Sequence, residues 1–130
     1  MSSKAPAIVV VDNDVSMRSS LVGLLQAAGY EVEGHASAEA FLGSGRLSST
    51  ACLILDVRMP GMSGVELLEH LERVGARIPI VFMTGDSASK LRSKATSARV
   101  VEFLEKPFSD DTLFDAIERA IRAAERCESG

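Results

Sequence analysis

The sequence contains no tryptophan, and its 130 residues include only two cysteines and 5% aromatic residues. Two cysteines cannot build the disulfide scaffold of a small secreted domain, and Cys52 lies in an apolar run that favours a buried, reduced thiol. The sequence also lacks the roughly 18 apolar residues of a membrane span, and its first apolar run is too short for a signal-peptide core. These absences predict a cytoplasmic protein with no membrane segment.

An excess of basic residues is missing as well. The chain has 14 Lys and Arg against 18 Asp and Glu, which gives a formal net charge of −4. General affinity for a nucleic-acid backbone needs a basic surface, so we expect no direct binding of nucleic acid. With 46% hydrophobic and 25% charged residues, the composition is that of one soluble globular domain. We therefore expect a single domain over residues 1–130, with a core from about 7 to 124, loose residues from 125 to 130 and no additional output domain.

Short apolar runs of strand length alternate with longer segments of helical period. The first, third and fourth of these runs are nearly continuous apolar residues, which is typical of parallel strands covered on both faces. The second run carries charge, which suits the edge of a sheet. The pattern predicts repeated βα units, and so a doubly wound α/β fold with a five-stranded parallel sheet. The five expected strands are Ala7–Val11, Glu31–His35, Ala51–Leu55, Pro79–Met83 and Val100–Leu104.

Capping residues mark the expected helices between these strands. An apolar stripe from Met17 to Ala28 predicts the first helix, and Gly29 ends it as a C-terminal cap. The later helices begin after residues that suit a helix start, and these are Ser37, Ser63, Asp86 and Ser109.

Polar side chains follow the apolar strands at their carboxyl ends. The carboxyl ends of parallel strands meet at one edge of the sheet, where ligands collect in this class of fold. We therefore expect the polar residues at these ends to lie close together. They are Asp12 and Asn13 after the first strand, Asp56 after the third, Thr84 after the fourth and Lys106 after the fifth.

This set of residues suits phosphoryl transfer. Clustered carboxylates repel each other unless a cation compensates, and Mg²⁺ binds such oxygens while it retains several waters. An aspartate can attack phosphorus and form an aspartyl phosphate. Thr84 can donate a hydrogen bond to a phosphoryl oxygen, and Lys106 can neutralise another.

Together these residues resemble the response-regulator receiver domain over nearly the whole chain, from about residue 8 to 124. The resemblance also rests on the segment Leu55–Gly64, the pair Thr84-Gly85 and the triplet Lys106-Pro107-Phe108. It implies a flavodoxin-like (βα)5 fold with strand order 2-1-3-4-5. It further implies that Asp56 is the phosphoacceptor.

The resemblance assigns the other site residues in the same way. Thr84 would be the switch hydroxyl, Lys106 its cationic partner and Phe103 the switch aromatic. The metal would be Mg²⁺, with Mn²⁺ as the alternative. The implied metal ligands are the side chains of Asp12, Asn13 and Asp56 and the backbone carbonyl of Arg58.

The resemblance also implies partners. A cognate sensor histidine kinase would supply the phosphoryl group, and slow hydrolysis would remove it, so the chain would not be an enzyme beyond these self-reactions. The motifs are most similar to receivers that precede a helix-turn-helix output domain, which implies transcription regulation through the face formed by the fourth helix, fifth strand and fifth helix. Basic residues at 90–94 and Arg99 and acidic residues at Asp110, Asp111 and Asp115 suggest a phosphorylation-dependent homodimer.

Other interpretations stay open at this point. Asn13 stands where the family has a second acid, which leaves room for a phosphate-independent pseudo-receiver that acts only as an interaction module. The segment Val11–Val15 also resembles the nucleophile motif of haloacid-dehalogenase-type phosphatases, although that function would leave Asp56 unexplained. A nucleotide-binding flavodoxin-like module would need Gly, Ser or Thr amides after the first strand, where this chain has carboxylates.

Overall fold

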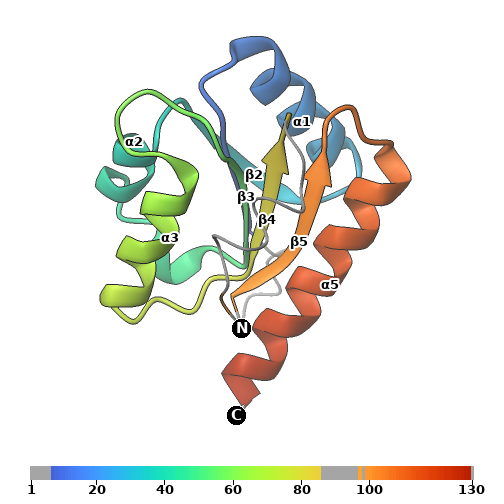
Figure 1. Ribbon diagram of the computed structural model, residues 1–130. Helices are drawn as coiled ribbons and strands as arrows, with labels where there is room; N and C mark the ends of the chain where they lie inside the picture. Colours follow the sequence, from blue (N-terminus) through green and yellow to red (C-terminus); the bar gives the residue numbers. More distant parts are fainter. Residues whose placement is uncertain (1–6, 86–96, 98, 130) are drawn as a thin grey trace.

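The computed structural model describes residues 7–85, 97 and 99–129 and contains one parallel sheet of five strands (Figure 1). The strand order is β2-β1-β3-β4-β5, so the predicted fold class and strand order are confirmed. The apolar strands β1, β3 and β4 are central, and the charged β2 lies at an edge, as expected. The strands are β1 Ala7–Val11, β2 Glu31–His35, β3 Cys52–Asp56, β4 Ile80–Thr84 and β5 Val100–Glu105.

Three strands end one residue later than the sequence pattern predicted. Asp56 and Thr84 are the last residues of β3 and β4, and β5 ends at Glu105. Both polar residues pair with the neighbouring strand, since Asp56 lies opposite Met83 and Thr84 lies opposite Glu105. The pleat of the strands therefore fixes the direction of both side chains, whereas a loop would leave that direction variable.

The helices lie in two layers, one on each face of the sheet (Figure 1). Side chains of α2 and α3 pack in one hydrophobic cluster with Val9 and Leu53, and side chains of α1 and α5 pack in a second cluster with Val10 and Ile54. Alternate residues of each central strand thus point into opposite clusters. The helices are α1 Val15–Ala27, α2 Ala38–Gly43, α3 Gly64–Arg73 and α5 Asp110–Ser129, with a short 3₁₀ helix η1 at Leu47–Ser49.

The capping predictions hold at three helix starts. Ser37 and Ser109 accept hydrogen bonds from the backbone three residues ahead, and Ser63 forms a reciprocal capping box with Glu66. The helix expected after Asp86 lies outside the described residues.

The expectation of loose residues was wrong for 125–129, because α5 continues to Ser129, and residue 130 lies outside the described residues. The sequence from Ala123 to Arg126 contains only strong helix formers, and no Gly or Pro interrupts the helix before its end.

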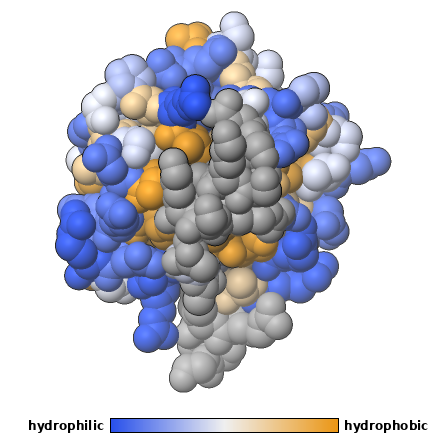
Figure 2. Space-filling view, viewed as in Figure 1, coloured by the Kyte–Doolittle hydropathy of each residue, from blue (hydrophilic) through white to orange (hydrophobic). Residues whose placement is uncertain are grey.

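The interior is aliphatic and closely covered. Cys52 is fully buried in β3, and burial raises the pKa of its thiol to about 12, which confirms the predicted buried cysteine. Among the described residues, the large hydrophobic side chains that are exposed are Val15 and Val74. On the face of the molecule drawn in Figure 2, the side chains around the rim are mostly hydrophilic. No helix within the described ranges has the length and apolar character needed to cross a bilayer.

Gly64 lets α3 begin directly against the end of β3. Its N–H donates a 2.9 Å hydrogen bond to the carbonyl of Val57. A Cβ at this position would lie 2.5 Å from the backbone oxygen of Asp56 and 3.1 Å from the ring of Phe82. Neither the strand backbone nor the buried ring can move aside easily, so the glycine fixes how closely the helix approaches the strand that carries Asp56.

We predict that Gly64→Ala lowers the free energy of unfolding by about 1–3 kcal/mol, because the added methyl group overpacks this contact. Gly23→Ala is the matched control, since Gly23 lies on the exposed side of α1 with nothing within 4 Å of its Cβ position. That change should raise stability by up to about 1 kcal/mol through helix propensity. Urea unfolding of both variants measures the difference, and equal stabilities would contradict the proposed overpacking.

Candidate functional site

Two buried carboxylates lie at the carboxyl ends of the two central strands. Asp12 follows β1 directly, Asp56 ends β3, and the strands pair in register up to Val11 and Leu55. The Asp12 side chain is 1% exposed and the Asp56 side chain 11%. The apolar strands thus hold two acids side by side, largely out of water.

Lys106 lies within ion-pair distance of both acids. Its Nζ is 3.7 Å from Oδ2 of Asp12 and 3.6 Å from Oδ1 of Asp56. The backbone N–H of Lys106 donates a 2.8 Å hydrogen bond to the carbonyl of Thr84, which holds the end of β5 against β4. The next peptide bond, to Pro107, is cis. One lysine therefore neutralises only one of the two carboxylate charges. When both acids are ionised, the three side chains carry a net charge of −1.

The electrostatics at Asp56 reflect this imbalance. Burial raises the pKa of Asp56, and the charge of Asp12 raises it further. Lys106 and a hydrogen bond from the backbone of Arg58 lower it by less. The ionised form of Asp56 is consequently unfavourable in the metal-free protein, and an added cation at this edge would relieve the repulsion.

The oxygens that are present fit a hard divalent cation. Oδ1 of Asp12 accepts a 2.9 Å hydrogen bond from the N–H of Asp14. Its other oxygen, Oδ2, is buried and has no hydrogen-bond partner within the described part of the chain. The described residues contain no group of three or more His, Cys, Asp or Glu side chains that would enclose a metal. Two carboxylates with further oxygens from amides, carbonyls and water are the environment in which Mg²⁺ binds.

Asn13 and Arg58 line a shallow hollow of about 520 Å³ at the same edge. Asn13 is exposed there. Neither acid lines this hollow, although Asn13 and Val57 directly follow Asp12 and Asp56 in the chain. Its lining consists of Asn13, Val57, Arg58, Met59, Pro60 and Ser63.

Thr84 and Phe103 occupy different surroundings. Thr84 is 4% exposed and ends β4, at the same edge as the two acids. Phe103 lies two strand positions before the end of β5, and its half-buried ring stacks on Phe82 with centroids 5.8 Å apart. The structure thus gathers Asp12, Asp56 and Lys106 in contact, places Thr84 at their edge, and leaves Phe103 in the hydrophobic cluster behind them.

The sequence analysis missed one residue that shapes this edge. Glu39 of α2 accepts a 3.0 Å hydrogen bond from the backbone N–H of Met62, 23 residues further along the chain. The loop passes so close that a Cβ on Gly61, whose φ is +77°, would lie 2.8 Å from the Glu39 carboxylate. A single acid in a short helix gives no sequence signal for such a contact.

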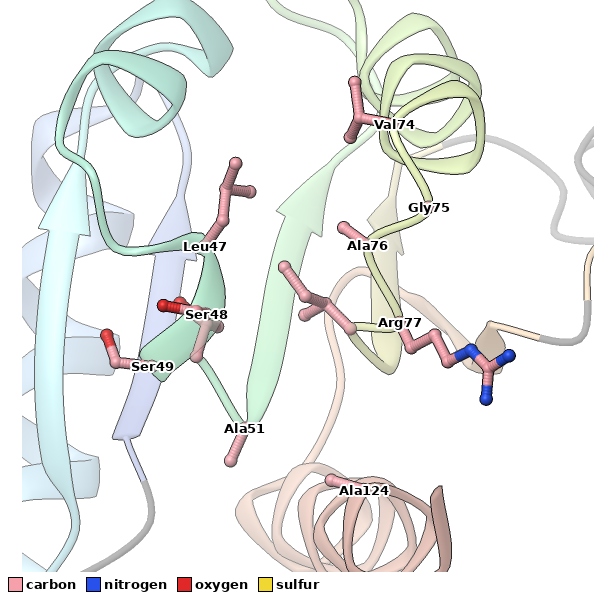
Figure 3. Close-up of a pocket in the computed structure, with 11 residues that line it drawn as sticks. Leu47, Ser48, Ser49, Ala51, Val74, Gly75, Ala76, Arg77 and Ala124 are labelled. Atoms are coloured by element: carbon pink, nitrogen blue, oxygen red, sulfur yellow. The ribbon is translucent and has the colours of Figure 1, made fainter. Parts of the chain in front are cut away.

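A second hollow of similar volume, about 530 Å³, lies at the opposite end of the sheet (Figure 3). Figure 3 shows η1 and the chain after α3 on two sides of it, with Ala124 of α5 below. The hollow contains none of the predicted site residues. Charge and burial therefore mark the candidate site, whereas cavity size does not.

Comparisons with known proteins agree with this geometry. Residues 8–118 match the family described as the response regulator receiver domain. The chain is 45% identical over 118 residues to the transcriptional regulatory protein FixJ of Bradyrhizobium diazoefficiens, covering 91% of this chain and 58% of FixJ. The structure of the response regulator StyR matches with a TM-score of 0.89 at 44% identity, covering 96% of this chain and 64% of StyR.

A third similarity concerns a structure with a bound ligand. The response regulator protein TrrA of Thermotoga maritima, in complex with Mg²⁺ and beryllium fluoride, matches with a TM-score of 0.76 at 27% identity, covering 88% of this chain and 98% of TrrA. The chain spans little more than half the length of the curated relatives that it matches first. These similarities favour the receiver over the phosphatase and the nucleotide-binding module.

The raised pKa of Asp56 predicts how metal-free stability depends on pH. Because the folded-state pKa lies above the ordinary value of about 4, the fold favours the protonated acid and loses stability as pH rises through the folded pKa. Asp56→Asn removes this loss, so the variant should be more stable than the wild type at neutral pH, and the difference should shrink towards pH 4. Urea unfolding with a chelator between pH 4.5 and 8 measures it. A constant difference across this range would show that Asp56 ionises without cost.

Proposed function

The chain belongs to the response regulator receiver family, and from this membership we propose that it accepts a phosphoryl group on Asp56 in a two-component phosphorelay. The observation that carries the proposal is the contact of one lysine with two buried carboxylates, since Lys106 Nζ lies within 3.7 Å of both Asp12 and Asp56. The proposed donor is the phosphohistidine of a cognate sensor histidine kinase.

In the proposed transfer, an Asp56 carboxylate oxygen forms a bond to phosphorus while the N–P bond of the donor histidine breaks. The electron pair of that bond stays on the imidazole nitrogen, which then takes up a proton. Burial leaves the Asp56 carboxylate poorly hydrated, so little water must be removed before it attacks. Lys106 balances charge that develops on the phosphoryl oxygens, and Thr84 donates a hydrogen bond to one of them.

The proposed metal ligands are the side chains of Asp12, Asn13 and Asp56 and the backbone carbonyl of Arg58. Oδ2 of Asp12 supports this assignment, because it is buried and has no hydrogen-bond partner among the described residues, as does the Mg²⁺ bound by the similar protein TrrA. When bound, Mg²⁺ would neutralise charge on the transferring phosphoryl group. Mn²⁺ prefers the same oxygen ligands and is the proposed substitute.

The proposed response to phosphorylation passes from Thr84 to β5. The backbone bond between Thr84 and Lys106 joins the ends of β4 and β5, and Phe103 stacks on Phe82 between the same strands. A shift of Thr84 towards a phosphoryl oxygen would therefore alter the face that β5 and α5 present to a partner. Slow hydrolysis of the aspartyl phosphate would reverse the change.

The proposed output is transcription regulation, because the similar protein FixJ is a transcriptional regulatory protein. The proposed location is the cytoplasm. An output segment would lie in the part of such relatives that this chain does not span.

Phosphorylation would also promote a homodimer through opposite charges. The acidic residues proposed for that contact, Asp110, Asp111 and Asp115, are exposed on α5. The basic residues at 90–94 lie outside the described residues, and Arg99 donates a hydrogen bond to the carbonyl of Ala76.

We predict that acetyl phosphate with Mg²⁺ adds one phosphoryl group to the wild type and none to Asp56→Asn, as measured by intact mass. Asp111→Asn, an exposed change of the same kind on α5, serves as the matched control and should be phosphorylated like the wild type. Beryllofluoride should also shift the amide resonances of Thr84 and Phe103. Absence of both effects at saturating Mg²⁺ would overturn the proposal and favour the phosphate-independent pseudo-receiver.

A second prediction concerns Asn13, which carries no charge. Asn13→Asp adds a charge near Asp12 and Asp56, so the metal-free protein should become less stable while Mg²⁺ binds more tightly. Two unit charges about 4 Å apart interact by roughly 1 kcal/mol in water and about 4 kcal/mol at an effective dielectric near 20, which supports a gain of at least several-fold. Phosphorylation should be faster only at sub-saturating Mg²⁺. Mg²⁺ titration and metal-free melting test both parts, and identical affinities would remove Asn13 from the metal site.

A further inference from the structure

Arg18 of α1 reaches back over the first turn of its helix to the end of β1. Its Nη1 donates a 2.7 Å hydrogen bond to the backbone carbonyl of Asp12. A bond from a guanidinium to a carbonyl is charge-assisted and therefore stronger than a bond between neutral groups. The contact fixes the peptide group that follows a carboxylate of the proposed site.

The other polar atoms of Asp12 are held as well. Its backbone N–H donates a 3.1 Å hydrogen bond to the carbonyl of His35 on β2, and its Oδ1 accepts the bond from Asp14. With the N–H, the carbonyl and Oδ1 each bound, both the backbone and the side-chain torsions of Asp12 are constrained. The atom that remains is Oδ2, which faces Lys106 at 3.7 Å.

Gly34 on β2 provides the space that this contact needs. A Cβ on Gly34 would lie 3.0 Å from Cγ and 3.1 Å from Cδ of Arg18, and 3.2 Å from a methyl group of Val22. The φ angle of Gly34 is not in the left-handed region, so the backbone alone does not require glycine here. The missing side chain instead lets the Arg18 stem lie flat against the edge strand.

We propose that Arg18 is a positioning residue for the metal site, acting through the Asp12 carbonyl and seated on Gly34. The proposal rests on the proposed function, in which Asp12 binds Mg²⁺. Partners that orient metal ligands from outside the ligand set commonly change metal affinity by 10- to 100-fold when they are removed. Arg18 would act in the same way through the backbone of Asp12, since it binds the carbonyl and not the carboxylate.

Because Arg18 is positively charged, the direction in which Arg18→Ala changes Mg²⁺ affinity tests the proposal. A positive charge near the site would repel Mg²⁺, so a role through charge alone predicts that Arg18→Ala binds Mg²⁺ more tightly. A positioning role predicts the opposite, because Asp12 loses one of its constraints. A role in folding alone predicts no change in affinity at temperatures where the variant is fully folded.

The experiment measures the Mg²⁺ dissociation constant from amide resonance shifts in wild type, Arg18→Ala, Gly34→Ala and the double variant, each checked for folding by thermal melting. We expect Arg18→Ala to weaken binding about tenfold. Gly34→Ala should weaken binding when Arg18 is present and have little effect when Arg18 is already absent, since the two residues act as one unit. Arg122→Ala, an exposed arginine on α5, is the matched control and should bind like the wild type.

The wild-type measurement separates the two proposals. If the wild type binds Mg²⁺ and is phosphorylated on Asp56, but Arg18→Ala and Gly34→Ala bind as tightly or more tightly, the role of Arg18 is overturned and the proposed function stands. If the wild type binds no Mg²⁺, the metal site itself fails and the role of Arg18 falls with it. Should Arg18→Ala not fold, Gly34→Ala alone decides, because it displaces the arginine and keeps its charge.

Discussion

Repulsion between two poorly hydrated carboxylates is the constraint on which the rest of this structure depends. Asp12 and Asp56 sit side by side because the strands before them are fully apolar and pair in register. Burial of those strands in two hydrophobic clusters contributes the free energy that holds the acids together. The site therefore holds an unfavourable interaction between the two acids, which a bound cation would relieve.

The two helical layers secure this edge with opposite charges. Arg18 of α1 binds a backbone carbonyl of the turn after β1, and Glu39 of α2 binds a backbone N–H of the loop after β3. On one face of the sheet the positively charged Arg18 donates to a carbonyl, and on the other face the negatively charged Glu39 accepts from an N–H. The loops around Asp12 and Asp56 are thus fixed by side chains that contact neither carboxylate.

Much of this arrangement could be predicted from the sequence because it follows from local patterns. The apolar runs identified all five strands, and the polar residues that interrupt them identified Asp12, Asp56 and Lys106 as neighbours. Contacts between helices and loops, such as that of Glu39 with Met62, could not be predicted, since no periodicity specifies them. Three strand ends were missed by one residue because pairing with a neighbouring strand, which propensity does not report, extends each of them.

The ring of Phe82 links two parts of the molecule that otherwise lie apart. It stacks on Phe103 of β5, and it also borders the space where Gly64 begins α3. A larger residue at position 64 would press on the Phe82 ring, and a smaller residue in place of Phe82 would leave a void beside both Gly64 and Phe103. Through this one ring, a change of volume at the start of α3 would be transmitted to the packing of β5.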